Sequence, residues 1–178
     1  MLNLKGYGKR GKNNPHFYLI IGCGHFGSRA AKKLSERNSH SRIIVVDQNK
    51  KALQKVSRLP IEPSVSDGTV FLEQFLSKGK RVDYIIPAVP LHLAFEFILS
   101  RLRPWGAKRK RIRPVAGLPN AVIGKTGDLY TSLANFLCSE DCPEPAQYCT
   151  VTRKRRPKPL YKILSDLKGP FESKVIRS

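Results

Sequence analysis

The residues with the clearest chemical use are glycines spaced as GxGxxG in the run GCGHFG at 22–27. This run directly follows FYLII at 17–21, a continuous apolar stretch that is typical of a buried parallel strand. It opens a segment, at 26–37, in which apolar residues recur at helical spacing. A glycine-rich turn between a buried strand and a helix is the context in which this spacing binds the pyrophosphate of a dinucleotide.

Each glycine has a separate physical role in such a loop. Gly22 permits the tight turn, Gly24 lets the phosphates approach the backbone, and Gly27 lets the helix pack closely on the strand. The first amides of the helix and the positive end of its dipole then face the phosphates. We therefore predict that the dinucleotide contacts this loop, and we include the two residues between its last glycines, His25 and Phe26.

An acidic residue stands where the ribose of such a cofactor is usually bound. Asp47 ends the second predicted strand, RIIVVD at 42–47, about 20 residues after Gly27. A carboxylate there accepts hydrogen bonds from the adenosine ribose hydroxyls and repels a ribose phosphate, so NAD(H) is favoured over NADP(H). The alternative is a strand-ending aspartate that only caps the next helix.

A second aspartate follows the third predicted strand, in the sequence SDG at 66–68. Asp67, with Gly68 after it at the exit of a strand, can reach the edge of the adenine. The same residue types also form ordinary turns and helix N-caps. Both interpretations stay open, and we include Asp67 and Gly68 among the predicted cofactor-binding residues.

The segments LIIGCGHFGSRAAKKL, IIVVDQNKKAL and VSDGT resemble the NAD-binding domain of TrkA-type potassium uptake regulators and the related regulatory domains of potassium channels. The resemblance covers roughly residues 17–102 and implies a Rossmann fold and a homodimer. It also implies nucleotide contacts from the following residues: Gly22, Gly24, Gly27, Asp47 and Asp67. The sequence departs from the family at Ser66, where Gly usually precedes the Asp, and from 119 onward, where the family's C-terminal ligand domain has no counterpart. The fold and the nucleotide carry over from the resemblance, whereas regulation of potassium transport does not.

Three cysteines lie close together in the C-terminal part of the sequence, in the pattern Cys138-x3-Cys142-x6-Cys149. Thiolates at this density can chelate a soft metal, so zinc or an iron–sulfur cluster is one interpretation of the pattern. A fourth ligand is not evident, and the candidates are Cys23, His16, His25, Glu140 and Asp141. Reduced thiols in a loop and a redox-active disulfide are the other interpretations, because spacing alone sets no geometry.

The alternation of strand and helix patterns predicts an α/β fold, a Rossmann-type doubly wound parallel sheet. Besides the two strands already named, strands are expected at 59–65, 83–89 and, at the edge of the sheet, 113–118. Helices are expected at 26–37, 49–57, 69–77 and 91–102.

The composition divides the chain into three parts. A basic arm at 1–15 precedes the dinucleotide-binding domain at 16–118. The remainder, 119–178, is a basic extension rich in Cys and Pro, mostly irregular, with helices expected at 129–137 and 160–167. Such an extension cannot build a large core alone.

The charge is strongly unbalanced, with 33 basic and 13 acidic residues and a formal net charge of +20. This charge attracts polyanions but also serves solubility, so we expect weak, non-specific polyanion binding. The basic residues cluster at 5–12, 101–113 and 153–162. No apolar run approaches the roughly 20 residues that span a bilayer, and no signal segment follows the basic N-terminus. We therefore expect a cytoplasmic protein without a transmembrane segment.

Nothing in the sequence supplies an acid to pair with His25, so we assign no catalytic residue. The leading hypothesis is a non-catalytic NAD(H)-binding protein that senses nucleotide or redox state, with the cysteine cluster as a second sensing or metal site. The first alternative is an NAD-dependent oxidoreductase with a metal or iron–sulfur centre. The second alternative is a basic adaptor that binds nucleic acid or a membrane surface.

Overall fold

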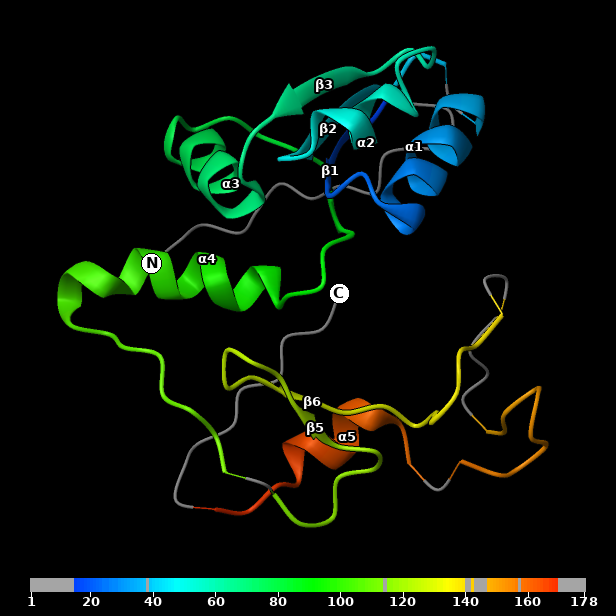
Figure 1. Ribbon diagram of the computed structural model, residues 1–178, viewed down its shortest axis with the longest axis vertical. Helices are drawn as coiled ribbons and strands as arrows, with labels where there is room; N and C mark the ends of the chain where they lie inside the picture. Colours follow the sequence, from blue (N-terminus) through cyan, green and yellow to red (C-terminus); the bar gives the residue numbers. More distant parts are fainter. Residues whose placement is uncertain are drawn as a thin grey trace. The chain divides into compact units, whose positions relative to one another are not determined.

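The computed structural model describes residues 15–37, 39–113, 115–139, 142, 147–156 and 158–169. The chain forms two compact units, Met1–Lys108 and Arg109–Ser178 (Figure 1). The boundary between them precedes the boundary expected at 118. The expected basic arm at 1–15 lies outside the described residues, except for its last residue.

The first unit contains a four-stranded parallel sheet in the order β3-β2-β1-β4. Its strands are β1 (Phe17–Ile21), β2 (Arg42–Asp47), β3 (Glu62–Val65) and β4 (Tyr84–Pro87). Its helices are α1 (His25–Arg37), α2 (Lys50–Gln54), α3 (Gly68–Ser77), α4 (Leu93–Leu102) and the short 3-10 helix η1 (Arg103–Trp105). Strand and helix alternate along the chain, so the predicted Rossmann-type α/β fold is confirmed.

The two central strands are buried because their sequences are continuous apolar runs. Successive side chains of a strand point to opposite faces of the sheet, and each face here has its own core. Leu19 and Ile21 of β1 pack with Leu72 of α3, whereas Ile20 packs with buried residues of α1 and α2. Helices therefore cover both faces of the sheet, as a doubly wound fold requires (Figure 1).

The order of the strands determines where a ligand can bind. The chain runs from β1 outward through β2 to β3 and then returns to the other side of β1 to form β4. The loop after β1 leads to α1 on one face, and the loop after β4 leads to α4 on the other face. The carboxyl ends of these neighbouring strands therefore diverge into a crevice, which is where open α/β sheets bind ligands.

The second unit contains a short antiparallel hairpin of β5 (Val122–Ile123) and β6 (Leu129–Tyr130) and the helix α5 (Leu160–Ser165). The prediction of a helix at 129–137 is wrong, because the first of these residues pair with β5 instead. Gly127, with a φ of +86°, lets the chain reverse within a tight turn. Pairing with a distant strand thus overrides the local apolar pattern.

Two further expectations concern the second unit. The described residues within 113–118 form loop and turn, so the predicted edge strand is absent there and the sheet of the first unit ends at β4. The helix predicted at 160–167 is present as α5. In the described part of the chain, no helix is long and apolar enough to cross a membrane.

Candidate dinucleotide-binding site

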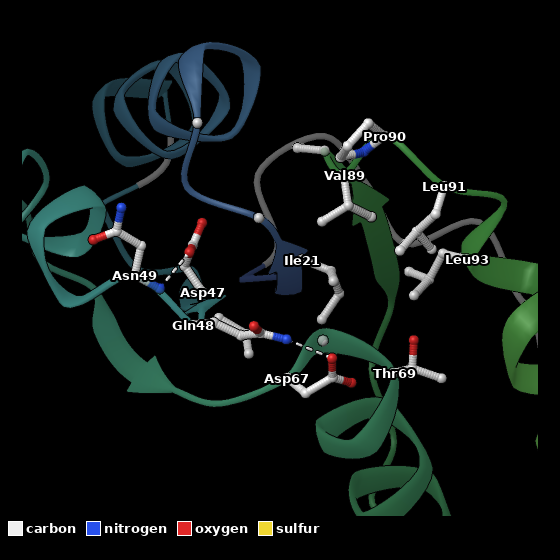
Figure 2. Close-up of a pocket in the computed structure, with 15 residues that line it drawn as sticks. Ile21, Asp47, Gln48, Asn49, Asp67, Thr69, Val89, Pro90, Leu91 and Leu93 are labelled. Atoms are coloured by element: carbon white, nitrogen blue, oxygen red, sulfur yellow. Dashed lines mark hydrogen bonds between the residues drawn. The ribbon is translucent and has the colours of Figure 1, made fainter. Parts of the chain in front are cut away.

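A cleft of about 410 Å³ opens at the carboxyl ends of the parallel strands (Figure 2). Its walls come from the glycine loop after β1, the segment after β2, the start of α3 and the segment between β4 and α4. Small-molecule sites in proteins typically have volumes of roughly 300–1,000 Å³. The cleft therefore has the size and the position of a nucleotide site.

The glycines of the loop differ in what surrounds them. Gly22 has a φ of +99°, and a Cβ there would lie 2.5 Å from the carbonyl oxygen of Ala88. A Cβ at the buried Gly27 would lie 1.8 Å from the carbonyl oxygen of Gly22. Gly24 lines the cleft, and a Cβ there would have no heavy atom within 4 Å. Packing thus requires glycine at the first and third positions, whereas the second leaves open space beside the backbone.

The Asp47 carboxylate joins the glycine loop to the start of α2. Its Oδ2 accepts a hydrogen bond from Cys23 N at 2.6 Å, and its Oδ1 accepts one from Asn49 N at 2.7 Å. The N-cap of α2 is Asn49, whose side chain accepts a hydrogen bond from Lys51 N, so Asp47 does not act as the helix cap. Each carboxylate oxygen can accept a further hydrogen bond, which a ribose hydroxyl can donate.

Asp67 is the N-cap of α3. Its Oδ1 accepts a hydrogen bond from Val70 N at 2.9 Å, and its Oδ2 accepts one from Gln48 Nε2 at 2.6 Å (Figure 2). Gly68 lines the cleft beside it, and a Cβ there would lie 2.3 Å from Ile21 Cγ2. The structure therefore shows the N-cap role that the sequence left open, and contact between Asp67 and the adenine stays a prediction.

Several residues that line the cleft were missed by the sequence analysis. Gln48, directly after Asp47, forms the bridge to Asp67 that links the ends of β2 and β3. The opposite wall is apolar and consists of Val89, Pro90, Leu91 and Leu93 (Figure 2). A prediction of the strand order could have identified this wall. In that order β4 lies next to β1, so the segment after β4 lies beside the segment after β1.

His25 and Phe26 are the first residues of α1 and do not line the cleft. The Phe26 side chain is 68% exposed, and the two rings meet edge to face with centroids 5.3 Å apart. The structure thus does not bring these two predicted contact residues into the cleft, because they lie on the exposed start of the helix.

The loop cysteine, Cys23, is a packing residue. Its buried Sγ donates a hydrogen bond to the carbonyl oxygen of Ala52 at 3.3 Å. Burial raises the pKa of the Cys23 thiol, and the nearby charge of Asp47 raises it further. The thiol therefore stays protonated at neutral pH and is a poor metal ligand.

Among the described residues, no three His, Cys, Asp or Glu side chains are placed to share an ion, so the structure does not show the metal site predicted at Cys138, Cys142 and Cys149. Cys138 is exposed. The Sγ of Cys142 lies 3.8 Å from Thr150 Oγ1, and the Sγ of Cys149 accepts a hydrogen bond from Thr152 N at 3.5 Å. Two of the sulfurs thus have local partners, which the linear spacing could not reveal. The suggested ligands Glu140 and Asp141 lie outside the described residues.

Two different families match two separate parts of the chain. Residues 18–79 match the family described as the TrkA-N domain. Residues 95–178 match a family described as an uncharacterized protein, C-terminal domain. No curated protein matches the chain.

The first match covers β1 to α3 and includes both the glycine loop and Asp47. TrkA-N domains typically bind NAD(H), and the cleft described above lies in the same part of the fold. The resemblance noted from the sequence is therefore confirmed as a match: residues 18–79 are similar to the TrkA-N domain, and the first unit has the parallel α/β sheet of a Rossmann-type fold.

Proposed function

We propose that this protein binds NAD(H) in the cleft of its first unit and acts as a regulatory sensor of nucleotide or redox state. The observation that carries the proposal is the hydrogen bond between the glycine loop and Asp47 in the crevice beside β4. This arrangement puts amide donors for the phosphates next to a carboxylate for the ribose hydroxyls. The match to the TrkA-N domain supports the same cofactor.

The residues present fit the phosphates of a dinucleotide. Gly24 faces open space in the cleft, so the pyrophosphate can reach the backbone there without meeting a side chain. The 13-residue helix α1 begins directly after it and contributes the positive end of its dipole. Among the described residues that line the cleft there is no Lys or Arg, so the backbone and the dipole are what would hold the phosphates.

The charge of the cleft favours NAD(H) over NADP(H). Its lining includes the carboxylates of Asp47 and Asp67 and, among the described residues, no cationic side chain that could pair with a ribose phosphate. A phosphate on the adenosine ribose would meet the Asp47 carboxylate directly. Lys50 and Lys51 follow in α2 but do not line the cleft.

The apolar wall of the cleft gives nucleotide binding a way to act on the rest of the chain. Leu91 and Leu93 line the cleft, and Leu93 is also the first residue of α4. The second family match begins at residue 95, within the same helix. We infer that nucleotide binding shifts the position or the order of α4, and that the segment 95–178 carries the regulatory output.

The proposal includes a homodimer in the cytoplasm, as the resemblance to TrkA-type regulators implies. Helix α4 supports it, because some of its large apolar side chains remain exposed: Phe95 is 41% and Ile98 is 40% exposed. A second copy of the chain is the partner we expect on this helix. Exposed apolar side chains that cluster in this way commonly mark protein interfaces.

Replacing Asp47 tests the assignment of the cofactor. Fluorescence titration of the full chain should show NADH binding at least tenfold more tightly than NADPH, a difference of about 1.4 kcal/mol. Asp47→Asn removes the repulsion and should bring the two affinities within about threefold of each other. Glu36→Gln is the matched control, because it removes the same charge from an exposed position of α1 and should leave both affinities unchanged.

Two outcomes would contradict this proposal. Equal affinities of the unaltered protein for NADH and NADPH would remove the assigned role of Asp47. A preference that survives in Asp47→Asn would show that another group selects the cofactor. Thermal melts of each variant, recorded without nucleotide, separate a loss of binding from a loss of folding, because Asp47 also accepts hydrogen bonds from Cys23 and Asn49.

A further inference from the structure

A small hairpin at 147–156 in the second unit holds Cys149 in a fixed position. Arg156 N donates a hydrogen bond to the carbonyl oxygen of Gln147 at 2.7 Å, and Cys149 N donates one to the carbonyl oxygen of Lys154 at 2.9 Å. Arg153 N then donates to the carbonyl oxygen of Cys149, also at 2.9 Å. Backbone hydrogen bonds on both sides of the turn therefore hold the backbone of Cys149 in place within the hairpin.

The surroundings of this thiol stabilise its anionic form. The Sγ of Cys149 accepts a hydrogen bond from Thr152 N at 3.5 Å. Hydrogen bonds from the side chain and the backbone of Thr152, together with the positive charge of Arg156, lower the pKa of the Cys149 thiol to about 7. About half of the Cys149 side chains are then thiolates at neutral pH, and the thiolate is the form that attacks a disulfide.

A second thiol lies beside the same turn. The Sγ of Cys142 is 3.8 Å from Oγ1 of Thr150, and Thr150 directly follows Cys149 in the chain. The other cysteines differ from this pair: Cys23 is buried in the first unit, and Cys138 is exposed. The contact with Thr150 brings the Cys142 thiol to the residue next to Cys149 in the chain, and a second thiol near a nucleophilic thiol is what resolves a mixed disulfide internally.

We propose that Cys142 and Cys149 form a reversible disulfide by exchange with a low-molecular-weight disulfide that carries carboxylates. This inference goes beyond the nucleotide site and rests on the second unit alone. The exposed basic sequence RKR at 153–155 lies in the same hairpin and attracts such an anion electrostatically. Glutathione disulfide is a small disulfide of this kind, because it carries carboxylates.

The exchange balances in two steps. The Cys149 thiolate attacks one sulfur of the small disulfide, the S–S bond of that molecule breaks, and one small thiolate leaves and takes up a proton. The Cys142 thiol loses its proton to solvent and attacks the Cys149 sulfur of the mixed disulfide, which releases the second small thiol. The two protein thiols are oxidised by two electrons, and one small disulfide is reduced to two thiols.

Mass spectrometry of the full chain in oxidised and reduced glutathione tests the proposal, with free thiols trapped by alkylation and the bonded pair identified by peptide mapping. We expect a Cys142–Cys149 disulfide in the unaltered protein and in the controls Cys23→Ser and Cys138→Ser, reversed by reduced glutathione. Cys142→Ser should stop at the mixed disulfide on Cys149, and Cys149→Ser should form no internal disulfide. A bond that involves Cys138, or no bond at all, would overturn the pairing.

The pH dependence of alkylation provides a second readout that does not depend on disulfide formation. In Cys142→Ser, the alkylation rate of Cys149 should rise with pH to a midpoint near 7, because the reactive thiolate is formed as the proton leaves. At pH 7 the rate should be about threefold that of an ordinary peptide cysteine, since a larger thiolate fraction outweighs a lower intrinsic nucleophilicity. A midpoint near that of a free cysteine would refute Cys149 as the attacking group.

Discussion

Alanine in place of each loop glycine has a different consequence, because the three positions differ in what a Cβ would meet. At Gly27 the Cβ would lie 1.8 Å from a backbone oxygen, so the loop itself must move. At Gly22 the Cβ would lie 2.5 Å from the Ala88 oxygen, in a backbone conformation with a φ of +99°. At Gly24 it would point into open space at the cleft. Only the last substitution meets no neighbouring atom, so only this one should leave the stability unchanged.

The magnitudes follow from these contacts. Overpacking costs roughly 1–3 kcal/mol, and a left-handed conformation costs a side chain roughly 1–2 kcal/mol more. We expect Gly22→Ala to lower the free energy of unfolding by about 2–5 kcal/mol and Gly27→Ala by about 2 kcal/mol or more. Gly24→Ala should stay within about 0.5 kcal/mol of the unaltered protein. Circular dichroism melts can distinguish these three variants, because a loss of about 1 kcal/mol lowers the melting temperature of a small domain by roughly 4–8 °C.

Nucleotide titration completes the comparison. Gly24→Val, which places a larger side chain in the open space, should melt close to the unaltered protein and bind NADH at least tenfold more weakly, about 1.4 kcal/mol. Unchanged NADH binding by Gly24→Val would refute the assignment of the phosphates to this loop. A loss of stability in Gly24→Ala as large as that in Gly27→Ala would show that the structural reasoning about the loop is wrong.

Two other predictions concern the partners of the protein. Polynucleotide binding should be weak, should show no sequence preference and should fall steeply between about 50 and 200 mM salt, which filter binding over a salt series would measure. A shallow salt dependence with sequence discrimination would instead favour a nucleic-acid adaptor. Sedimentation equilibrium should give a mass twice the 20.0 kDa of one chain, and Ile98→Glu on α4 should reduce the measured mass to that of one chain. A monomer mass for the unaltered protein would contradict the proposed dimer.

The parts of the fold that were predicted correctly depend on local sequence. The apolar runs at 17–21 and 42–47 are short and flanked by turn residues, which favours buried strands, and the glycine spacing between the first strand and α1 is typical of a tight strand-to-helix turn. Both features are contained within a few residues of the chain. For this reason the central strands, the first helix and the cleft could be located without coordinates.

The parts that were missed depend on contacts between distant residues. The segment at 129–137 has an apolar helical pattern, but pairing with β5 across the turn at Gly127 makes its start a strand. The metal site was inferred from cysteine spacing, whereas in the hairpin at 147–156 the Sγ of Cys149 accepts a hydrogen bond from Thr152 N. Gln48 could not be identified either, since its bridge to Asp67 depends on how β2 and β3 align.

Calorimetric titration of the full chain with NADH tests the central claim most directly. The geometry of the glycine loop and Asp47 predicts saturable binding of one NADH per chain, with NADPH binding at least tenfold more weakly, about 1.4 kcal/mol. A chain that folds with the expected helix content but binds neither nucleotide at millimolar concentration, about −4 kcal/mol, would contradict the assignment of this cleft as a dinucleotide site.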